Sequence, residues 1–231
     1  MNTENVGDWS LAYRAVYAPA WLSVGLALKV LSPRFKVTGR GHLPRRGAVI
    51  FAPNHLSDID PVLIGYSALR PLAFMAKKPL FDIPVLGAMM RFANAFPVEQ
   101  NSPDRAALRQ AEEQLKMGHS LVIFPEGQCS PDGKLQPLLP GVALLALKCN
   151  VPVIPVGIIN SNQLMPYAKV LPRFTTSKVS INFAPPLVMD DLKDLPSREA
   201  RTMFNQRLET ALRGTLEAVA AGLSKSTFKG I

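Results

Sequence analysis

The sequence has few of the residues that build disulfide frameworks and metal centres. Its 231 residues include two cysteines and three histidines. Cys129 and Cys149 stand in unrelated local settings, so we expect free thiols and a reducing compartment. Neither His42 nor His119 has the spacing of a metal ligand relative to the segment around His55, and no metal site is predicted.

The N-terminal segment lacks the length of a membrane-spanning helix. The uncharged stretch between Arg14 and Lys29 is shorter than the roughly 20 residues that cross a bilayer, and Pro19 interrupts it. Aromatic residues nevertheless recur at helical spacing, which is typical of a helix lying at a membrane interface; they are Trp9, Tyr13, Tyr17 and Trp21. The alternative is a helix packed on the domain's own core. No signal-peptide cleavage pattern accompanies this segment.

Clusters of basic residues are absent, although the chain is basic. Its 26 lysines and arginines exceed its 17 acidic residues and give a net charge of +9. They are scattered, without a basic run or a nucleic-acid-binding motif, so nucleic acid is not an expected partner. The charge favours an anionic membrane surface instead, with the protein peripheral or monotopic on the cytoplasmic face.

The order of apolar segments predicts an α/β fold. Strands and helices alternate along the chain, which is typical of a mixed, mostly parallel sheet flanked by helices. We expect two units: an N-terminal interfacial helical segment, 1–32, and a main domain, 33–231. Pro155 and Gly157 interrupt a strand at 153–159 and suggest an edge or a bulge. Ser197 is expected to cap a final helix that ends near Ala221, and 160–178 is expected to form a flap facing substrate or membrane.

One polar corner follows a buried strand at 48–52. The strand ends at Pro53, and Pro61 suits the first turn of a helix that Asp60 would cap. His55 and Asp60 would diverge on one helix but can meet across a strand–turn–helix corner. A carboxylate bonded to one ring nitrogen would leave the other free as a base. A capped turn with a satisfied histidine is one alternative, and a metal site formed by His55, Asp58 and Asp60 is another.

A second corner follows the apolar strand at 121–124. Its sequence is Pro125-Glu126-Gly127-Gln128-Cys129-Ser130. Strand ends that carry polar corners form the crevice of an open α/β sheet, so the two corners together predict a site.

Three motifs in this order resemble blocks of the glycerolipid acyltransferase family, which includes the 1-acylglycerol-3-phosphate acyltransferases. They are Asn54-His55-x4-Asp60, Phe124-Pro125-Glu126-Gly127 and Val151-Pro152-Val153-Ile154-Pro155-Val156, within roughly 39–157. The resemblance implies that 33–231 is an acyltransferase domain. It would move an acyl chain from a thioester to a lysolipid hydroxyl without a cofactor. The thioester would be acyl-CoA or acyl-loaded acyl carrier protein.

The catalytic residues implied are His55 as the base and Asp60 as the group that orients it. Backbone N–H groups near the start of the helix after Pro61, or around Gly127, are expected to stabilise the oxyanion. No Gly-x-Ser-x-Gly motif occurs, which favours direct attack by the acceptor. Cys129 as an acyl carrier has no supporting sequence cue.

The acceptor site departs from the family pattern. Gln100 and Cys129 stand where the family usually has phosphate-holding arginines, and neither replaces a guanidinium. Lys77, which directly follows the predicted strand at 72–76, is expected to replace these arginines as the phosphate contact. The acceptor-binding residues predicted are therefore Glu126, Gly127, Lys77, Gln100 and Gln128. Glu126 has a structural alternative, in which it accepts backbone N–H bonds.

The acceptor predicted is 1-acyl-sn-glycerol-3-phosphate, which would give phosphatidic acid in phospholipid biosynthesis. A lyso-ornithine lipid or a lysophospholipid with a larger head group is the first alternative. An inactive lipid-binding module is the second.

Overall fold

A computed structural model describes residues 11–98, 105–167, 169 and 171–221. The strands are β1 (Lys36–Thr38), β2 (Ile50–Pro53), β3 (Leu72–Lys77), β4 (Ala95–Val98), β5 (Ser120–Val122), β6 (Val153–Ile159) and β7 (Ser180–Phe183). The α-helices are α1 (Leu11–Leu31), α2 (Asp60–Ala68), α3 (Pro84–Phe92), α4 (Arg105–Lys116), α5 (Gly141–Cys149), α6 (Ser161–Leu164) and α7 (Ser197–Ala220). Short 3-10 helices are η1 (Arg40–His42), η2 (Lys78–Asp82) and η3 (Asp190–Leu192).

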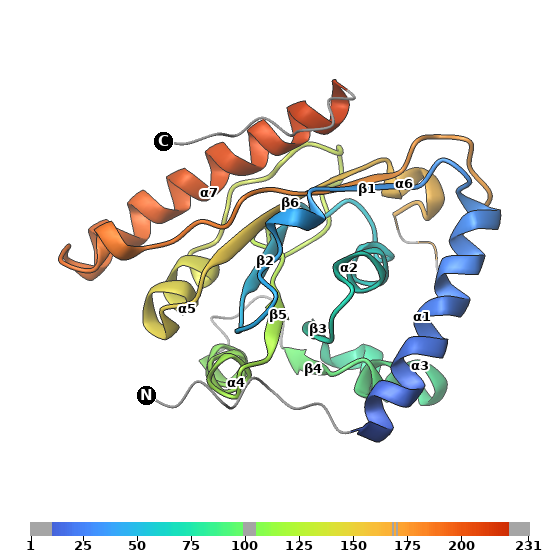
Figure 1. Cartoon of the computed structure of the whole chain (residues 1–231), viewed down its shortest axis with the longest axis horizontal. Coiled ribbons are helices and arrows are strands. Elements are labelled where there is room, and N and C mark those ends of the chain that lie inside the picture. Colours follow the sequence, from blue (N-terminus) through green and yellow to red (C-terminus); the bar gives the residue numbers. More distant parts are fainter. Residues whose placement is uncertain (1–10, 99–104, 168, 170, 222–231) are drawn as a thin grey trace.

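The strands form one sheet in the order β1-β7-β6-β2-β5-β3-β4 (Figure 1). Among the strands that the structure describes, only β6 and β7 pair antiparallel, which confirms the predicted mixed, mostly parallel sheet. The chain leaves β2 toward β3, beyond β5, whereas it leaves β5 toward β6, beyond β2. Such opposite departures create a crevice at the carboxyl ends of neighbouring strands. The two polar corners predicted from the sequence begin at the ends of β2 and β5.

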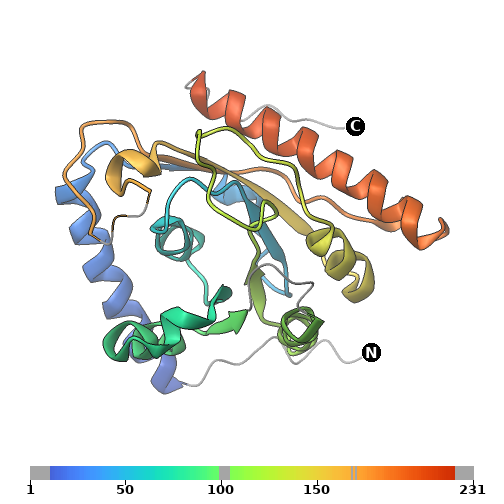
Figure 2. The same ribbon diagram turned by 180° about the vertical axis from the view of Figure 1, so that it is seen from behind.

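Helices cover both faces of the sheet (Figures 1 and 2). Buried residues of α4, α5 and α7 pack on one face, and those of α1, α2 and α6 on the other. Alternate residues of β2 supply the two cores, because successive side chains of a strand point to opposite faces. Ile50 and Ala52 face the first core, whereas Val49 and Phe51 face the second.

The strand β6 is central, so the expectation of an edge strand was wrong. Pro155 lies at the end of the ladder with β7, where its carbonyl accepts the N–H of Ala184 at 2.9 Å. Its missing N–H therefore costs at most one terminal hydrogen bond. Gly157 faces α7, and a Cβ there would lie 2.7 Å from Cγ2 of Thr215. The glycine is explained by the close approach of a helix, not by a bulge.

The final helix begins one residue earlier than a serine cap requires. Pro196 occupies the N-cap position of α7, and no side chain caps the helix. Ser197 is thus its first residue, which corrects the expected cap. The apolar face is buried as predicted at Phe204, Leu208 and Leu212.

The helix α1 packs against α2 through glycines. The ring of Trp21 lies over Gly65, and the ring of Tyr66 lies 2.7 Å from the place of a Cβ on Gly25. Trp21 therefore contacts the domain and does not face outward, which corrects the expected aromatic face at this residue. Trp9 and the side chains of Tyr13 and Tyr17 lie outside the described residues.

The outer face of α1 is aliphatic. Leu22, Leu26 and Val30 are 75%, 65% and 64% exposed. Over the described residues, no helix combines the length and the apolar character required to span a bilayer.

Candidate active site

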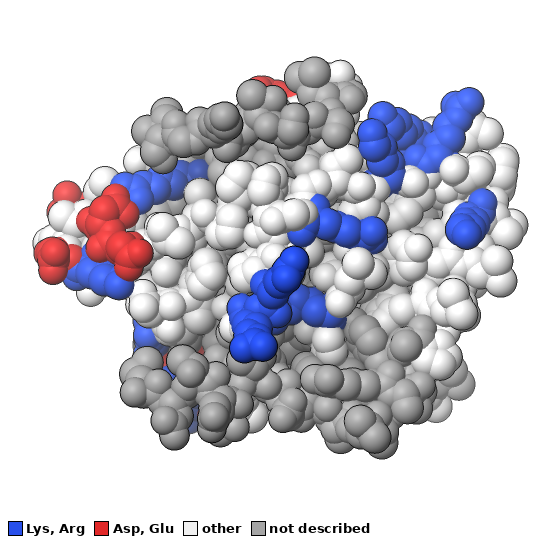
Figure 3. Space-filling view, viewed as in Figure 1, with Lys and Arg blue, Asp and Glu red and all other residues white. Residues whose placement is uncertain are grey.

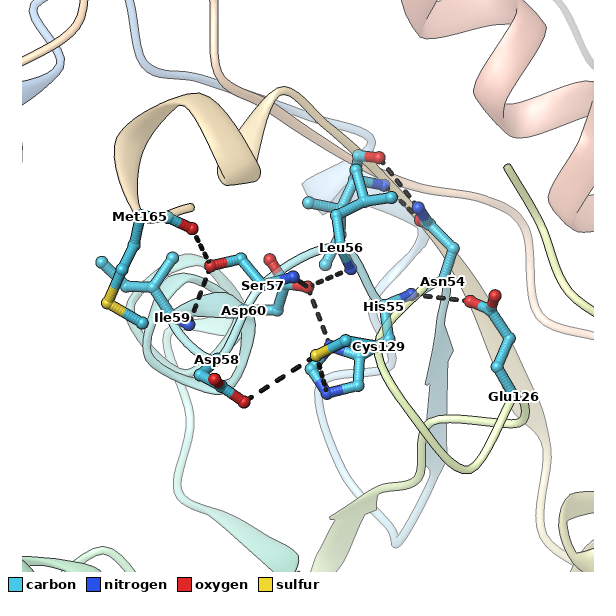
Figure 4. A network of polar contacts seen from close by, with 11 residues as sticks. Asn54, His55, Leu56, Ser57, Asp58, Ile59, Asp60, Glu126, Cys129 and Met165 are labelled. Atoms are coloured by element: carbon cyan, nitrogen blue, oxygen red, sulfur yellow. Dashed lines mark hydrogen bonds and ion pairs between the residues drawn. The ribbon is translucent and has the colours of Figure 1, made fainter. Parts of the chain in front are cut away.

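The first corner is anchored to the neighbouring strand by an asparagine. Asn54 directly follows β2, and its buried side chain donates to the carbonyl of Ile158 at 3.0 Å. Its Oδ1 accepts the N–H of the same residue at 2.7 Å. This paired contact with β6 fixes where the turn leaves the sheet (Figure 4).

The carboxylate of Asp60 organises the turn. Its Oδ2 accepts hydrogen bonds from His55 Nδ1 at 3.0 Å, the N–H of Leu56 at 2.7 Å and the N–H of Ser57 at 2.9 Å. Asp60 is fully buried and is the first residue of α2, whose N-cap residue is Ile59. The carboxylate therefore turns back into the corner and does not cap the helix, which corrects the sequence-based expectation.

These contacts set the protonation pattern of His55. An ionised carboxylate only accepts hydrogen bonds, so Nδ1 carries the proton and Nε2 keeps its lone pair. The ring stacks on Phe124 with centroids 3.8 Å apart, and 14% of the side chain is exposed. The structure thus presents an oriented, accessible imidazole nitrogen.

The second corner holds the backbone of the first. Glu126 is buried, and its two oxygens accept the N–H groups of His55 at 2.7 Å and Gln136 at 2.8 Å. Ser130 donates its N–H to the His55 carbonyl at 2.7 Å. Burial raises the pKa of Glu126, and the two backbone N–H bonds partly offset this rise. These contacts match the structural alternative for Glu126; its predicted acceptor contact stays a prediction.

One N–H group expected near the oxyanion is already engaged. Gly127 donates its N–H to the Phe124 carbonyl at 3.1 Å. Gly127 has φ +74°, and a Cβ there would lie 2.6 Å from Cδ1 of Leu139. The N–H of Gly127 therefore holds the second corner together and is not available to an oxyanion, whereas the predicted contribution of the N–H groups after Pro61 stays a prediction.

A cysteine from the second corner meets the histidine ring. The Sγ of Cys129 lies 3.2 Å from Nε2 of His55. Burial, followed by the charges of Asp58 and Asp60, raises the pKa of the Cys129 thiol to about 12, with Lys77 acting in the opposite direction. The thiol is therefore protonated at neutral pH and donates to Nε2, which disfavours the acyl-carrier alternative.

The other predicted acceptor residues are only partly placed. Lys77 is the exposed last residue of β3, and its charge acts on Cys129. Gln128 is exposed next to Gly127. Gln100 lies outside the described residues.

Sequence reasoning did not predict four contacts of this site. Phe124 supports the histidine ring, and Ser57 donates its hydroxyl to the Met165 carbonyl at 2.5 Å, joining the corner to the 160–178 segment. The Sγ of Cys129 lies near both Nε2 of His55 and Oδ1 of Asp58. Phe124 belongs to a recognised motif, but no local signal in the sequence indicates the contact between the two corners that brings Cys129 to the ring.

Comparison with known proteins identifies the family. A family model described as Acyltransferase matches residues 34–159, more than half of the chain. The chain belongs to the acyltransferase family. This assignment confirms the resemblance carried by the three motifs.

Two relatives and one solved structure are similar to this chain in sequence or fold. The chain is 28% identical over 171 residues to a 1-acyl-sn-glycerol-3-phosphate acyltransferase of Limnanthes douglasii, covering 72% of the chain and 59% of that relative. It is also 28% identical over 191 residues to the 1-acyl-sn-glycerol-3-phosphate acyltransferase of Bacillus subtilis, covering 81% of the chain and 92% of that relative. The crystal structure of PlsC, the 1-acyl-sn-glycerophosphate acyltransferase of Thermotoga maritima, has a TM-score of 0.73 at 28% identity and covers 91% of this chain and 82% of its own.

We predict that Glu126→Gln destabilises the protein. A glutamine offers one acceptor oxygen to two N–H donors, so one N–H would face an NH₂ group, at a cost of about 1–3 kcal/mol. Urea unfolding measures this, with Glu113→Gln on the exposed side of α4 as the control. An unchanged unfolding free energy together with a raised KM for the acceptor would instead assign Glu126 to acceptor binding.

Proposed function

We propose that the protein transfers an acyl chain from an acyl thioester to the free hydroxyl of 1-acyl-sn-glycerol-3-phosphate, forming phosphatidic acid. The observation that carries this proposal is the 3.0 Å contact of His55 Nδ1 with the buried Asp60 carboxylate, which leaves Nε2 as a base at the sheet crevice. The family assignment and the names of the plant and Bacillus relatives support it.

The proposed chemistry starts with removal of a proton. A hydroxyl is a poor nucleophile at neutral pH, so a base within hydrogen-bond reach is needed. Nε2 of His55 takes the proton as the hydroxyl attacks the thioester carbonyl, and Asp60 stabilises the imidazolium that forms. The proton then passes to the departing thiolate. Because the thiol of Cys129 is the present partner of Nε2, the acceptor hydroxyl has to replace it.

The donor in this scheme is acyl-CoA or acyl-loaded acyl carrier protein, bound as a substrate. Thioesters are already activated acyl groups, so the scheme requires no cofactor. No covalent acyl-enzyme is required either, because the acceptor attacks the thioester directly.

We predict that His55→Ala lowers the turnover rate by roughly 10²- to 10⁴-fold, the usual worth of general-base help. Acyl transfer to lysophosphatidic acid from radiolabelled acyl-CoA measures this rate, with urea unfolding as a check on folding. His119→Ala, at the far end of α4 and bonded to Gln114, is the control and is expected to keep turnover. Near wild-type turnover of folded His55→Ala would refute the assignment of the base.

Phosphate recognition requires a cation that this chain does not supply at the family's usual places. A phosphomonoester carries nearly two negative charges. We propose that Lys77 contacts it, because this lysine is exposed at the end of β3 and its charge acts on the site at Cys129.

Lys77→Ala is expected to raise the KM for lysophosphatidic acid by about 10- to 100-fold, the loss of one charge-assisted hydrogen bond. The KM for lysophosphatidylcholine should change much less. Lys36→Ala, exposed on β1, is the matched control. Equal effects on both acceptors would refute this role for Lys77. Wild-type preference for a lyso-ornithine lipid or lysophosphatidylcholine would support the alternative acceptor.

An apolar surface lies beside the C-terminal end of α1. It comprises Leu22, Leu26 and Val30 of α1 with Tyr167, Leu171 and Phe174 of the flap at 160–178, all more than 60% exposed. The flap joins the helix through the N–H of Thr175, which donates to the Leu31 carbonyl at 2.8 Å, and through Arg34, which donates to the Thr176 carbonyl at 3.2 Å.

Basic residues lie beside one end of this surface. Figure 3 shows lysines and arginines gathered over the end of α1 and the flap. The exposed basic residues of these segments are Lys29, Arg34, Lys169, Arg173 and Lys178. Apolar side chains next to cations suit the surface of an anionic membrane. We therefore propose peripheral or monotopic attachment through this surface. The two cysteines are free thiols, which supports the cytoplasmic face.

We predict that Leu22→Gln, Leu26→Gln and Val30→Gln combined weaken vesicle binding at least about tenfold. Burial of one such side chain is worth about 1.5–3 kcal/mol when complete. Co-sedimentation with phosphatidylglycerol–phosphatidylcholine vesicles measures binding, and Met117→Gln, 50% exposed after α4, is the control. Substitution is preferred to deletion of α1, because deletion would uncover α2. Unchanged binding of the triple variant would refute this surface.

A further inference from the structure

The side chains of His55, Asp58 and Cys129 bring three different metal-binding atoms together. The Sγ of Cys129 lies 3.2 Å from His55 Nε2 and 3.8 Å from Oδ1 of Asp58. The ligand atoms of all three residues lie within 4.8 Å of one another. Figure 4 shows Cys129 between the imidazole and the Asp58 carboxylate. The residues come from two corners that only the sheet brings together.

The two separations from Sγ are close to those of a tetrahedral zinc site. Zinc binds imidazole nitrogen and carboxylate oxygen at about 2.0–2.2 Å and thiolate sulfur at about 2.3 Å, so neighbouring ligand atoms lie about 3.4–3.6 Å apart. The two distances from Sγ, 3.2 and 3.8 Å, fall on either side of this range. A thiolate combined with an imidazole also favours zinc over magnesium or calcium, which prefer oxygen ligands.

The support of the histidine has the form found at zinc sites. A histidine ligand usually donates its second ring N–H to a carboxylate, a backbone carbonyl or water, which orients the ring and raises its basicity. Asp60 accepts that N–H here at 3.0 Å, and Phe124 stacks on the ring. The lone pair that acts as the base is thus the same lone pair that a metal would take.

The cluster can be reached from solvent. Asp58 is exposed, and Cys129 and His55 are partly exposed. Three protein ligands leave a fourth position for water, as in open zinc sites. Zinc-bound thiols are deprotonated, so binding would release the Cys129 proton to solvent. An arginine at position 129 would repel a cation, so the site depends on the cysteine of this chain.

We propose that His55, Asp58 and Cys129 bind Zn²⁺ and that bound zinc blocks acyl transfer by occupying Nε2 of His55. The first part of this proposal, the binding half, is that zinc binds, and it is supported by the geometry alone. The second part, the inhibition half, is that bound zinc blocks acyl transfer, and it rests on the proposed function.

Metal titration of the full chain tests the binding half. Co²⁺ as a spectroscopic substitute should give a sulfur-to-metal charge-transfer band and the intense visible bands of a tetrahedral site. Cys129→Ser should abolish the charge-transfer band and weaken zinc binding, measured by competition with a chromophoric chelator, by at least about 10- to 100-fold. Asp58→Asn should weaken binding and keep the sulfur band. Cys149→Ser, on α5, is the matched control and should keep both properties.

Zinc affinity that is equal in wild type and Cys129→Ser, or cobalt binding without a sulfur band, would overturn the binding half. Asp58→Asn provides a second check that does not alter the thiol.

The inhibition half is tested by turnover with buffered zinc. Zinc should inhibit the wild-type protein, a chelator should restore the rate, and Cys129→Ser should lose this zinc dependence. Bound zinc without inhibition would overturn this half. Absence of turnover in metal-free wild type would count against the proposed function, while the cobalt spectrum would still decide metal binding.

Discussion

The buried carboxylate of Asp60 is the interaction on which the site depends. One of its oxygens receives two peptide N–H groups and the ring N–H of His55, so a single group closes the turn and orients the histidine. Hydrogen bonds to a charged group contribute about 1.5–3 kcal/mol each, which offsets the cost of burying the charge. Its position at the first residue of α2 adds the favourable field of the helix N-terminus. Folding and activation of the base are therefore parts of the same interaction.

The second corner completes this arrangement without supplying a base. Parallel pairing of β2 with β5 sets Ile50 opposite Leu121 and Phe51 opposite Val122, so both strands end at the same edge of the sheet. Glu126 and Ser130 then bind the peptide groups of His55 from both sides. Loss of either corner would release the histidine, because its backbone is held by one corner and its ring by the other.

Position 129 connects the two proposals for this site, acceptor recognition and zinc binding. An arginine there would add positive charge for a phosphate, whereas the thiol of Cys129 adds a soft ligand beside an imidazole and a carboxylate. The lone pair of His55 Nε2 then has competing partners: the Cys129 proton, an acceptor hydroxyl and a metal ion. The competition between these partners is expected to set the activity of the site in this chain, and Lys77 is left as the proposed contact for the acceptor phosphate.

Local patterns in the sequence determined the alternating elements, the two polar corners and the pairing of His55 with Asp60. These features depend on apolar periodicity, proline positions and a spacing of five residues, which act over short distances along the chain. Tertiary structure alone decided that β6 is central, because Pro155 meets the end of a ladder and Gly157 meets α7. It also decided that Trp21 packs on α2 and that Cys129 reaches His55. These contacts join segments distant in sequence, and their partners are chosen by strand order and helix packing, which no local pattern encodes.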